Sequence, residues 1–137
     1  MAENIRVLIV DNEERFRETT AAILERRGFE VKAVGSGIEA IEEIRKDKID
    51  VVVLDLEMPG MDGIATLGEM NRLGLLVKTL ILTGHGSVHT ALEAVKLGAY
   101  DYLSKPCGIE ELVEKIDEAW ENNGKRKSRS VFGKQRK

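Results

Sequence analysis

Five polar side chains that follow or end short apolar runs could together act on a metal ion or an anion. They are Asp11, Asn12, Asp55, Thr83 and Lys105. Two adjacent carboxylates favour either a bound cation or a raised pKa. Oxygen ligands without cysteine or histidine suit a hard ion such as Mg²⁺ rather than zinc. A lysine and a hydroxyl beside them would contact a phosphoryl group, if the chain brings all five together.

Asp55 is the side chain of this set that could form a covalent bond to phosphorus. An ionised carboxylate can attack without a separate general base, while a metal ion neutralises charge on the transferring oxygens. Gly84, directly after Thr83, would leave room for the phosphoryl group. A strand-end aspartate taken alone is more often a helix cap or a turn residue. The hypothesis therefore depends on the elements that position these residues.

Apolar strand patterns alternate with amphipathic helix patterns along the chain. The predicted strands cover residues 5–10, 29–34, 49–55, 78–83 and 100–104. The predicted helices lie within residues 13–27, 36–47, 62–73, 87–98 and 109–122. Residues 51–54 are four consecutive apolar residues, which predicts a strand buried on both faces. Met58, Pro59 and Gly60 break that strand, Asp62 can cap the helix that follows, and Ser87 can cap the fourth helix.

This alternation predicts an α/β fold with a five-stranded parallel sheet covered by helices on both sides. Its size fits a flavodoxin-like, doubly wound (βα)5 fold with strand order 2-1-3-4-5. In such sheets ligands bind beyond the carboxyl ends of the strands, at the switch point between the first and third strands. Asp11 and Asp55 would flank that point. The inner stripe expected for the second helix is Ile38, Ile41, Ile44 and Ala40.

Composition limits the class of protein. The chain has 137 residues, 42% of them hydrophobic and 4% aromatic, so we expect one domain with an aliphatic core. The single cysteine, Cys107, excludes an internal disulfide and is expected to pack near a helix start rather than to be a reactive thiol. No apolar run approaches the ~20 residues that span a bilayer, and the amino terminus does not resemble a signal peptide. We therefore expect a cytoplasmic protein.

Charge is distributed unevenly. Seven of the 21 basic residues and none of the 24 acidic ones lie in residues 125–137, which leaves a net charge of −10 on residues 1–124. We expect a folded domain over residues 1–123 and a basic, disordered tail over residues 124–137. An acidic domain argues against a nucleic-acid surface on the domain itself.

Four segments resemble the receiver domain of bacterial two-component response regulators, of the single-domain type. They are VDNEE at 10–14, VVVLDLEMPGMDG at 51–63, LILTGHG at 80–86 and GAYDYLSKP at 98–106. The resemblance covers residues 4 to about 122. It implies that Asp55 accepts phosphate from a phosphohistidine on a sensor histidine kinase or phosphotransfer protein. It also implies a downstream partner protein, and a monomer or a phosphorylation-dependent dimer.

The resemblance further implies roles for the other residues. The implied Mg²⁺ ligands are Asp11, Asn12, Asp55 and the backbone carbonyl of Glu57. Thr83 and Lys105 would contact the phosphoryl group, the peptide before Pro106 would be cis, and Tyr102 would be the switch residue of an output surface formed by the fourth helix, fifth strand and fifth helix. The family usually has two acids where this chain has Asp11 and Asn12, so we expect weaker Mg²⁺ binding.

Two other functions are compatible with the residues. A DNA-associated regulator could use the basic tail to contact phosphates. A phosphatase of the same fold could use the same aspartyl-phosphate chemistry, although no substrate pocket or cap domain is evident in the sequence. A phosphoacceptor that assists its own phosphoryl transfer, rather than an enzyme, is the interpretation that the motifs favour.

Overall fold

The computed structural model describes residues 4–75, 77–84 and 88–122, in which five strands alternate with five helices. The strands are β1 (Arg6–Val10), β2 (Glu30–Val34), β3 (Val51–Leu54), β4 (Lys78–Thr83) and β5 (Asp101–Ser104). The helices are α1 (Glu14–Arg26), α2 (Gly37–Lys46), α3 (Gly63–Arg72), α4 (Val88–Lys96) and α5 (Ile109–Glu121). Every predicted element is present, with ends within two residues of the predicted ones. The expected cap Ser87 and the expected tail lie outside the described residues.

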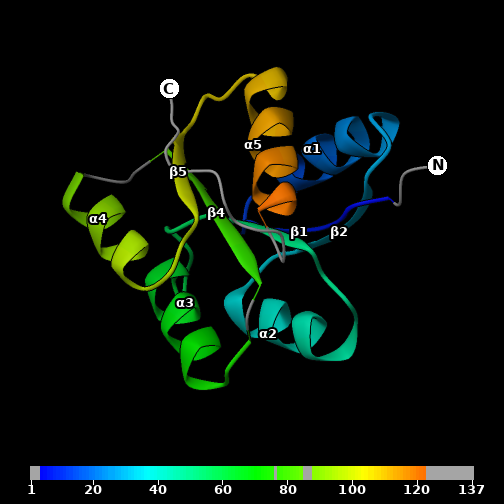
Figure 1. The fold of residues 1–137 in the computed structure, drawn as a ribbon. Coiled ribbons are helices and arrows are strands. Elements are labelled where there is room, and N and C mark those ends of the chain that lie inside the picture. Colours follow the sequence, from blue (N-terminus) through cyan, green and yellow to red (C-terminus); the bar gives the residue numbers. More distant parts are fainter. Residues whose placement is uncertain (1–3, 76, 85–87, 123–137) are drawn as a thin grey trace.

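All five strands are parallel and lie in the order β2-β1-β3-β4-β5, as predicted. Figure 1 shows α1 and α5 on one face of the sheet and α2, α3 and α4 on the other. The fold is the flavodoxin-like, doubly wound α/β class. Its parallel strands all end at the same edge, where the predicted site residues follow.

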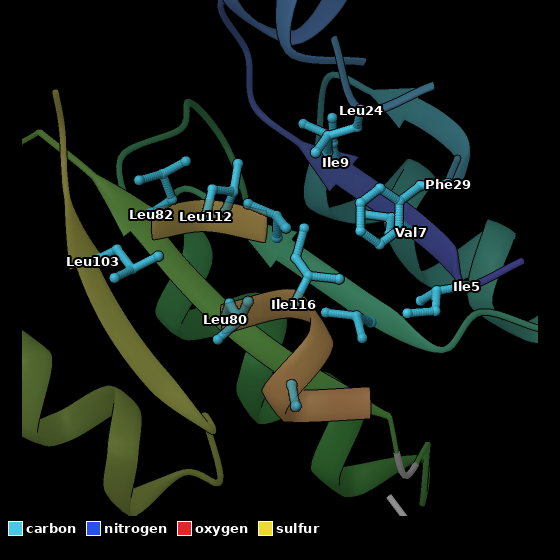
Figure 2. Packing of buried hydrophobic residues seen from close by; sticks show 13 residues of the cluster. Ile5, Val7, Ile9, Leu24, Phe29, Leu80, Leu82, Leu103, Leu112 and Ile116 are labelled. Carbon is cyan, nitrogen blue, oxygen red and sulfur yellow. The ribbon is translucent and has the colours of Figure 1, made fainter. Parts of the chain in front are cut away.

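The central strands are buried on both faces because each face carries a helical layer. Val7 and Ile9 of β1 point into the cluster under α1 and α5, whereas Leu8 and Val10 point into the cluster under α2, α3 and α4. Figure 2 shows the first cluster, in which side chains of β1 and β4 meet Leu112 and Ile116 of α5. Continuous apolar runs in these strands follow from this two-sided burial.

Ile38 is a correction to the predicted inner stripe of α2. Its side chain is 59% exposed, whereas Ala40 and Ile41 are buried and Ile44 packs against the core. The buried stripe begins at Gly37, which approaches α3 closely, and this rotates Ile38 to the rim of the helix. Ile38 instead lines a surface groove between α2 and α3 together with Met61.

Helix α4 also leaves apolar side chains in solvent. Ala94 is fully buried, but Leu92 is 58% exposed and Val95 is 48% exposed. The helix is therefore anchored through a small residue, and its larger apolar residues form an exposed surface.

Candidate functional site

Parallel pairing places Asp11 and Asp55 side by side at the carboxyl edge of the sheet. β1 and β3 pair so that Val10 lies opposite Leu54, and an aspartate follows each of these residues. The Asp55 amide donates to the Val10 carbonyl at 3.0 Å, which continues the ladder past the strand ends. Both carboxylates are buried, as their position between neighbouring strands requires.

Each of these carboxylates is oriented by a local backbone hydrogen bond. Asp11 Oδ1 accepts from the amide of Glu13 at 2.9 Å. Asp55 Oδ1 accepts from the amide of Glu57 at 3.2 Å. These two-residue turns are typical of aspartate at the end of an element. The same arrangement at both strand ends leaves the Oδ2 atoms for other partners.

Lys105 joins the two Oδ2 atoms. Its Nζ lies 2.7 Å from Asp11 Oδ2 and 3.7 Å from Asp55 Oδ2, and its side chain is 19% exposed. A buried carboxylate is costly without a positive partner, so this ammonium stabilises the pair. Lys105 reaches across from the end of β5, and its amide donates to the Thr83 carbonyl at 2.9 Å. The Lys105–Pro106 peptide is cis, as expected.

The first turn of α1 adds two residues that the sequence analysis did not assign to the site. Lys105 Nζ lies 4.0 Å from the centre of the Phe16 ring. Arg17 Nη1 donates to the Asp11 carbonyl at 3.1 Å. Because α1 begins only three residues after Asp11, its first turn lies next to the end of β1. The short distance in sequence between Asp11 and residues 16 and 17 is the signal that could have identified them. Phe16 instead matched the pattern of a core residue.

Loop geometry between β3 and α3 fixes the backbone at Asp55. Asp62 Oδ1 accepts from the Ala65 amide at 2.8 Å, which confirms the predicted cap of α3. Gly63 donates to the Leu56 carbonyl at 2.9 Å. A Cβ on Gly63 would lie 2.6 Å from the Asp55 carbonyl oxygen, so glycine is required for this close approach. The loop therefore returns tightly onto the strand end that carries Asp55.

The remaining predicted residues lie around this centre. Thr83 is buried at the end of β4, and Asn12 and Glu57 are exposed beside Asp11 and Asp55. Tyr102 is half-buried on β5, in register with Ile81, and packs against the core cluster under α2, α3 and α4. Thus Lys105 pairs with both Asp11 and Asp55, whereas Tyr102 packs on the face of the sheet that α2, α3 and α4 cover.

A family model described as the response regulator receiver domain matches residues 7–117. The chain belongs to this family. Receiver domains are regulatory modules of two-component systems, and phosphorylation and Mg²⁺ binding are typical of them. The resemblance carried by the four sequence segments is thereby confirmed.

The curated relatives are longer than this chain and match it over part of their length. The chain is 39% identical over 117 residues to the transcriptional regulatory protein ZraR of Escherichia coli (strain K12), and the match covers 85% of this chain and 26% of that protein. It is 38% identical over 119 residues to the NtrX-like response regulator of Rickettsia bellii (strain RML369-C), covering 85% and 25%. The chain spans about a quarter of the length of these relatives.

Solved structures of receiver domains share the fold. The crystal structure of FixJ-N is 35% identical, with a TM-score of 0.82 over 88% of this chain and 97% of that one. A CheY-like receiver domain protein from Methanospirillum hungatei JF-1 is 28% identical, with a TM-score of 0.82 over 87% and 95%. No helix in the described part of this receiver domain has the length and apolar character to cross a lipid bilayer.

The donor set of the receiver domain fits Mg²⁺. The described residues contain no group of three or more acidic, histidine or cysteine side chains that could hold a metal ion. Mg²⁺ is commonly bound through only one or two carboxylates, with waters and phosphate oxygens completing its octahedron. Asp11 and Asp55 supply two buried carboxylates that converge on one cation, the Lys105 ammonium. Asn12 and the Glu57 backbone would add neutral oxygens of the same hard character.

Cys107 of the receiver domain is not an activated thiol. Its pKa is raised to about 11, first by burial and then by the charge and hydrogen bond of the nearby Glu111 carboxylate. The thiol therefore stays protonated at neutral pH and is a poor nucleophile. This agrees with the expectation that Cys107 packs near a helix start.

Proposed function

We propose that this receiver domain is phosphorylated on Asp55 by the phosphohistidine of a sensor histidine kinase or phosphotransfer protein. The observation that carries the proposal is the convergence of Asp11 Oδ2 and Asp55 Oδ2 on Lys105 Nζ. Two buried carboxylates and one ammonium at the switch point of a parallel sheet are typical of a site that receives an anionic group next to a cation.

The chemistry follows from the residues. Asp55 Oδ2 attacks phosphorus, an O–P bond forms, and the electron pair of the breaking P–N bond returns to the imidazole nitrogen of the donor. Asp55 Oδ1 stays on the Glu57 amide, which holds the carboxylate in one orientation during attack. Lys105, already next to Asp55, pairs with a phosphoryl oxygen, and the Thr83 hydroxyl donates to another.

Asp11, Asp55, Asn12 and the Glu57 carbonyl are the residues that would hold Mg²⁺. When bound, the ion neutralises charge on the transferring oxygens. Asp11 keeps its orientation through the Glu13 amide and the Arg17 contact to its carbonyl. These residues would thus present oxygen atoms that are already oriented to bind a hard cation.

The surface formed by α4, β5 and α5 would transmit phosphorylation to a binding partner. Phosphorylation adds negative charge and acceptor oxygens near Thr83 and Lys105, which can shift the population of states of this region. Tyr102 would report that shift because it lies on β5, one strand from Thr83. The exposed Leu92 and Val95 offer apolar area to a partner protein or a second copy.

The proposal also assigns the domain bounds, the cellular location and the mode of action of the chain. We propose a receiver domain over residues 1–123, followed by a basic segment over residues 124–137. A cytoplasmic location fits the single cysteine, Cys107. The chain acts by switching its binding surface, not by turning over a substrate.

Mass measurement after incubation with Mg²⁺ and acetyl phosphate tests the proposal. Wild type is expected to gain the mass of one phosphoryl group, and Asp55→Asn is expected to gain none. Asp62→Asn is the matched control, because this exposed carboxylate lies in the same loop and its amide can still cap α3. Wild type without added mass, or equal labelling of Asp55→Asn, would exclude Asp55 as the acceptor.

A second candidate rests on the basic segment. Residues 125–137 carry seven positive charges and no negative ones, and the relative from Escherichia coli is named a transcriptional regulatory protein. DNA contact through this segment would be salt-sensitive and would disappear when residues 125–137 are deleted. Binding measured by fluorescence anisotropy at several salt concentrations separates this role from binding to a protein.

A further inference from the structure

The aromatic face of Phe16 lies against the ammonium that joins the two carboxylates. Lys105 Nζ is 4.0 Å from the ring centre, within the range of a favourable cation–π contact. The same Nζ is 2.7 Å from Asp11 Oδ2 and 3.7 Å from Asp55 Oδ2. Three groups from α1, the end of β1 and the end of β3 therefore surround one cation.

An aromatic ring differs from the carboxylates in what it offers to Lys105. Its negative face attracts the cation, but it has no strong acceptor atom that takes up an ammonium hydrogen. A lysine held by a ring keeps its position and remains able to donate to a new oxygen. A leucine in the same place would fill space without attracting the charge.

Phe16 itself is held firmly. It lies in the first turn of α1 and packs, partly buried, against the core cluster under α1 and α5. The next residue, Arg17, bonds to the carbonyl of Asp11, so this turn is connected to both the lysine and the metal-ligand candidate. The position of the ring is thus set by its packing on the core and by the first turn of α1.

We propose that Phe16 is a positioning residue for Lys105, whose ammonium the ring holds beside Asp55 for phosphoryl transfer. The proposal rests on the proposed function, in which Lys105 pairs with the incoming phosphoryl group. It adds a role for α1 that depends on the aromatic character of residue 16 and not only on its apolar volume.

A double-mutant cycle on the rate of labelling tests the role. Phe16→Leu is expected to slow labelling of Asp55 by acetyl phosphate by about three- to tenfold, the size of a partly desolvated cation–π contact. Phe16→Tyr keeps the ring and is expected to restore most of the rate. In a Lys105→Met background, the further change Phe16→Leu is expected to have no effect on the residual rate.

Phe29→Leu is the matched control, because Phe29 is a buried aromatic residue of the same core cluster and lies directly before β2. It should lower stability to urea while leaving the labelling rate within about twofold of wild type. A Phe16→Leu rate equal to that of Phe16→Tyr, or an equal Phe16→Leu effect with and without Lys105, would overturn the positioning role and leave the proposed function intact.

A second double-mutant cycle measures urea unfolding and does not depend on phosphorylation. It uses wild type, Phe16→Leu, Lys105→Met and the variant that carries both changes. Coupling between residues 16 and 105 in urea unfolding is expected if the ring holds the ammonium, and additive effects would overturn that contact. Wild type that is not labelled at all would overturn the proposed function and the rate effect. The unfolding cycle would then decide only whether Phe16 holds Lys105.

Discussion

Gly37 at the start of α2 lies directly against Thr66 of α3. A Cβ on Gly37 would be 2.1 Å from Thr66 Oγ1, and it would also lie 3.1 Å from the carbonyl oxygen of Met61. Thr66 cannot easily turn away, because its hydroxyl donates to the Asp62 carbonyl at 2.7 Å. The contact therefore joins α2 to the loop that returns from Asp55.

Gly37→Ala is expected to destabilise the fold because the added methyl group has no space. Overpacking of this kind costs about 1–3 kcal/mol in free energy of unfolding, measurable by urea denaturation. Gly68→Ala is the matched control, since Gly68 is also helical and nothing lies within 4 Å of the position of its Cβ. It should stabilise the protein by up to about 1 kcal/mol. Equal stabilities of the two variants would show that α2 and α3 pack differently.

The placement of the strand-end residues could be predicted from sequence because it depends on topology. Parallel strands end at one edge, so apolar runs followed by Asp11 and Asp55 are enough to bring these residues together. Contacts made by helices were harder to predict. The close packing of Gly37 on α3 left Ile38 exposed, and the position of α1 brought Phe16 to Lys105. Both depend on how a helix is rotated on the sheet, which apolar spacing defines only approximately.

Asn12→Asp is expected to raise Mg²⁺ affinity. Asn12 is exposed next to the buried Asp11, so a carboxylate there adds one negative charge near the proposed ion. One extra charge at this range and an intermediate dielectric corresponds to about tenfold in the dissociation constant. Isothermal titration calorimetry measures the dissociation constant of Mg²⁺ for both proteins. Asn4→Asp makes the same charge change just before β1, at the other end of that strand, and should have no such effect.

Equal Mg²⁺ affinities for wild type and Asn12→Asp would exclude residue 12 from the metal site. An equal gain in both aspartate variants would mean that overall charge, not ligation or proximity, determines the affinity.

Tyr102→Ala is expected to leave phosphorylation of Asp55 intact but to weaken the structural change that phosphorylation causes in α4. Tyr102 packs against the cluster under α2, α3 and α4, and the contacts between Lys105 and the carboxylates do not involve it. Labelling of Asp55 should continue at a rate within about twofold of wild type. The change of the α4 amide resonances on phosphorylation, followed by NMR at Leu92 and Val95, should shrink to less than about half. Full-sized α4 changes in the variant would contradict a switch role for Tyr102.

Cys107 is expected to react slowly with iodoacetamide below pH 9. Its pKa is raised to about 11, first by burial and then by the charge and hydrogen bond of Glu111. At pH 8 only about one thiol in a thousand would be ionised, so the alkylation rate should rise about tenfold per pH unit until pH approaches 11. Glu111→Gln removes the charge, lowers the pKa and should speed alkylation at pH 8.

Glu114→Gln is the control for this series, since Glu114 is an exposed carboxylate on the same helix, α5. It should leave the alkylation rate unchanged. Burial is the largest cause of the shift, so Glu111→Gln should recover only part of the reactivity of an ordinary cysteine. An alkylation rate that levels off near pH 8.5 in the wild-type protein would mean that Cys107 is solvated, and that the start of α5 packs less closely than described.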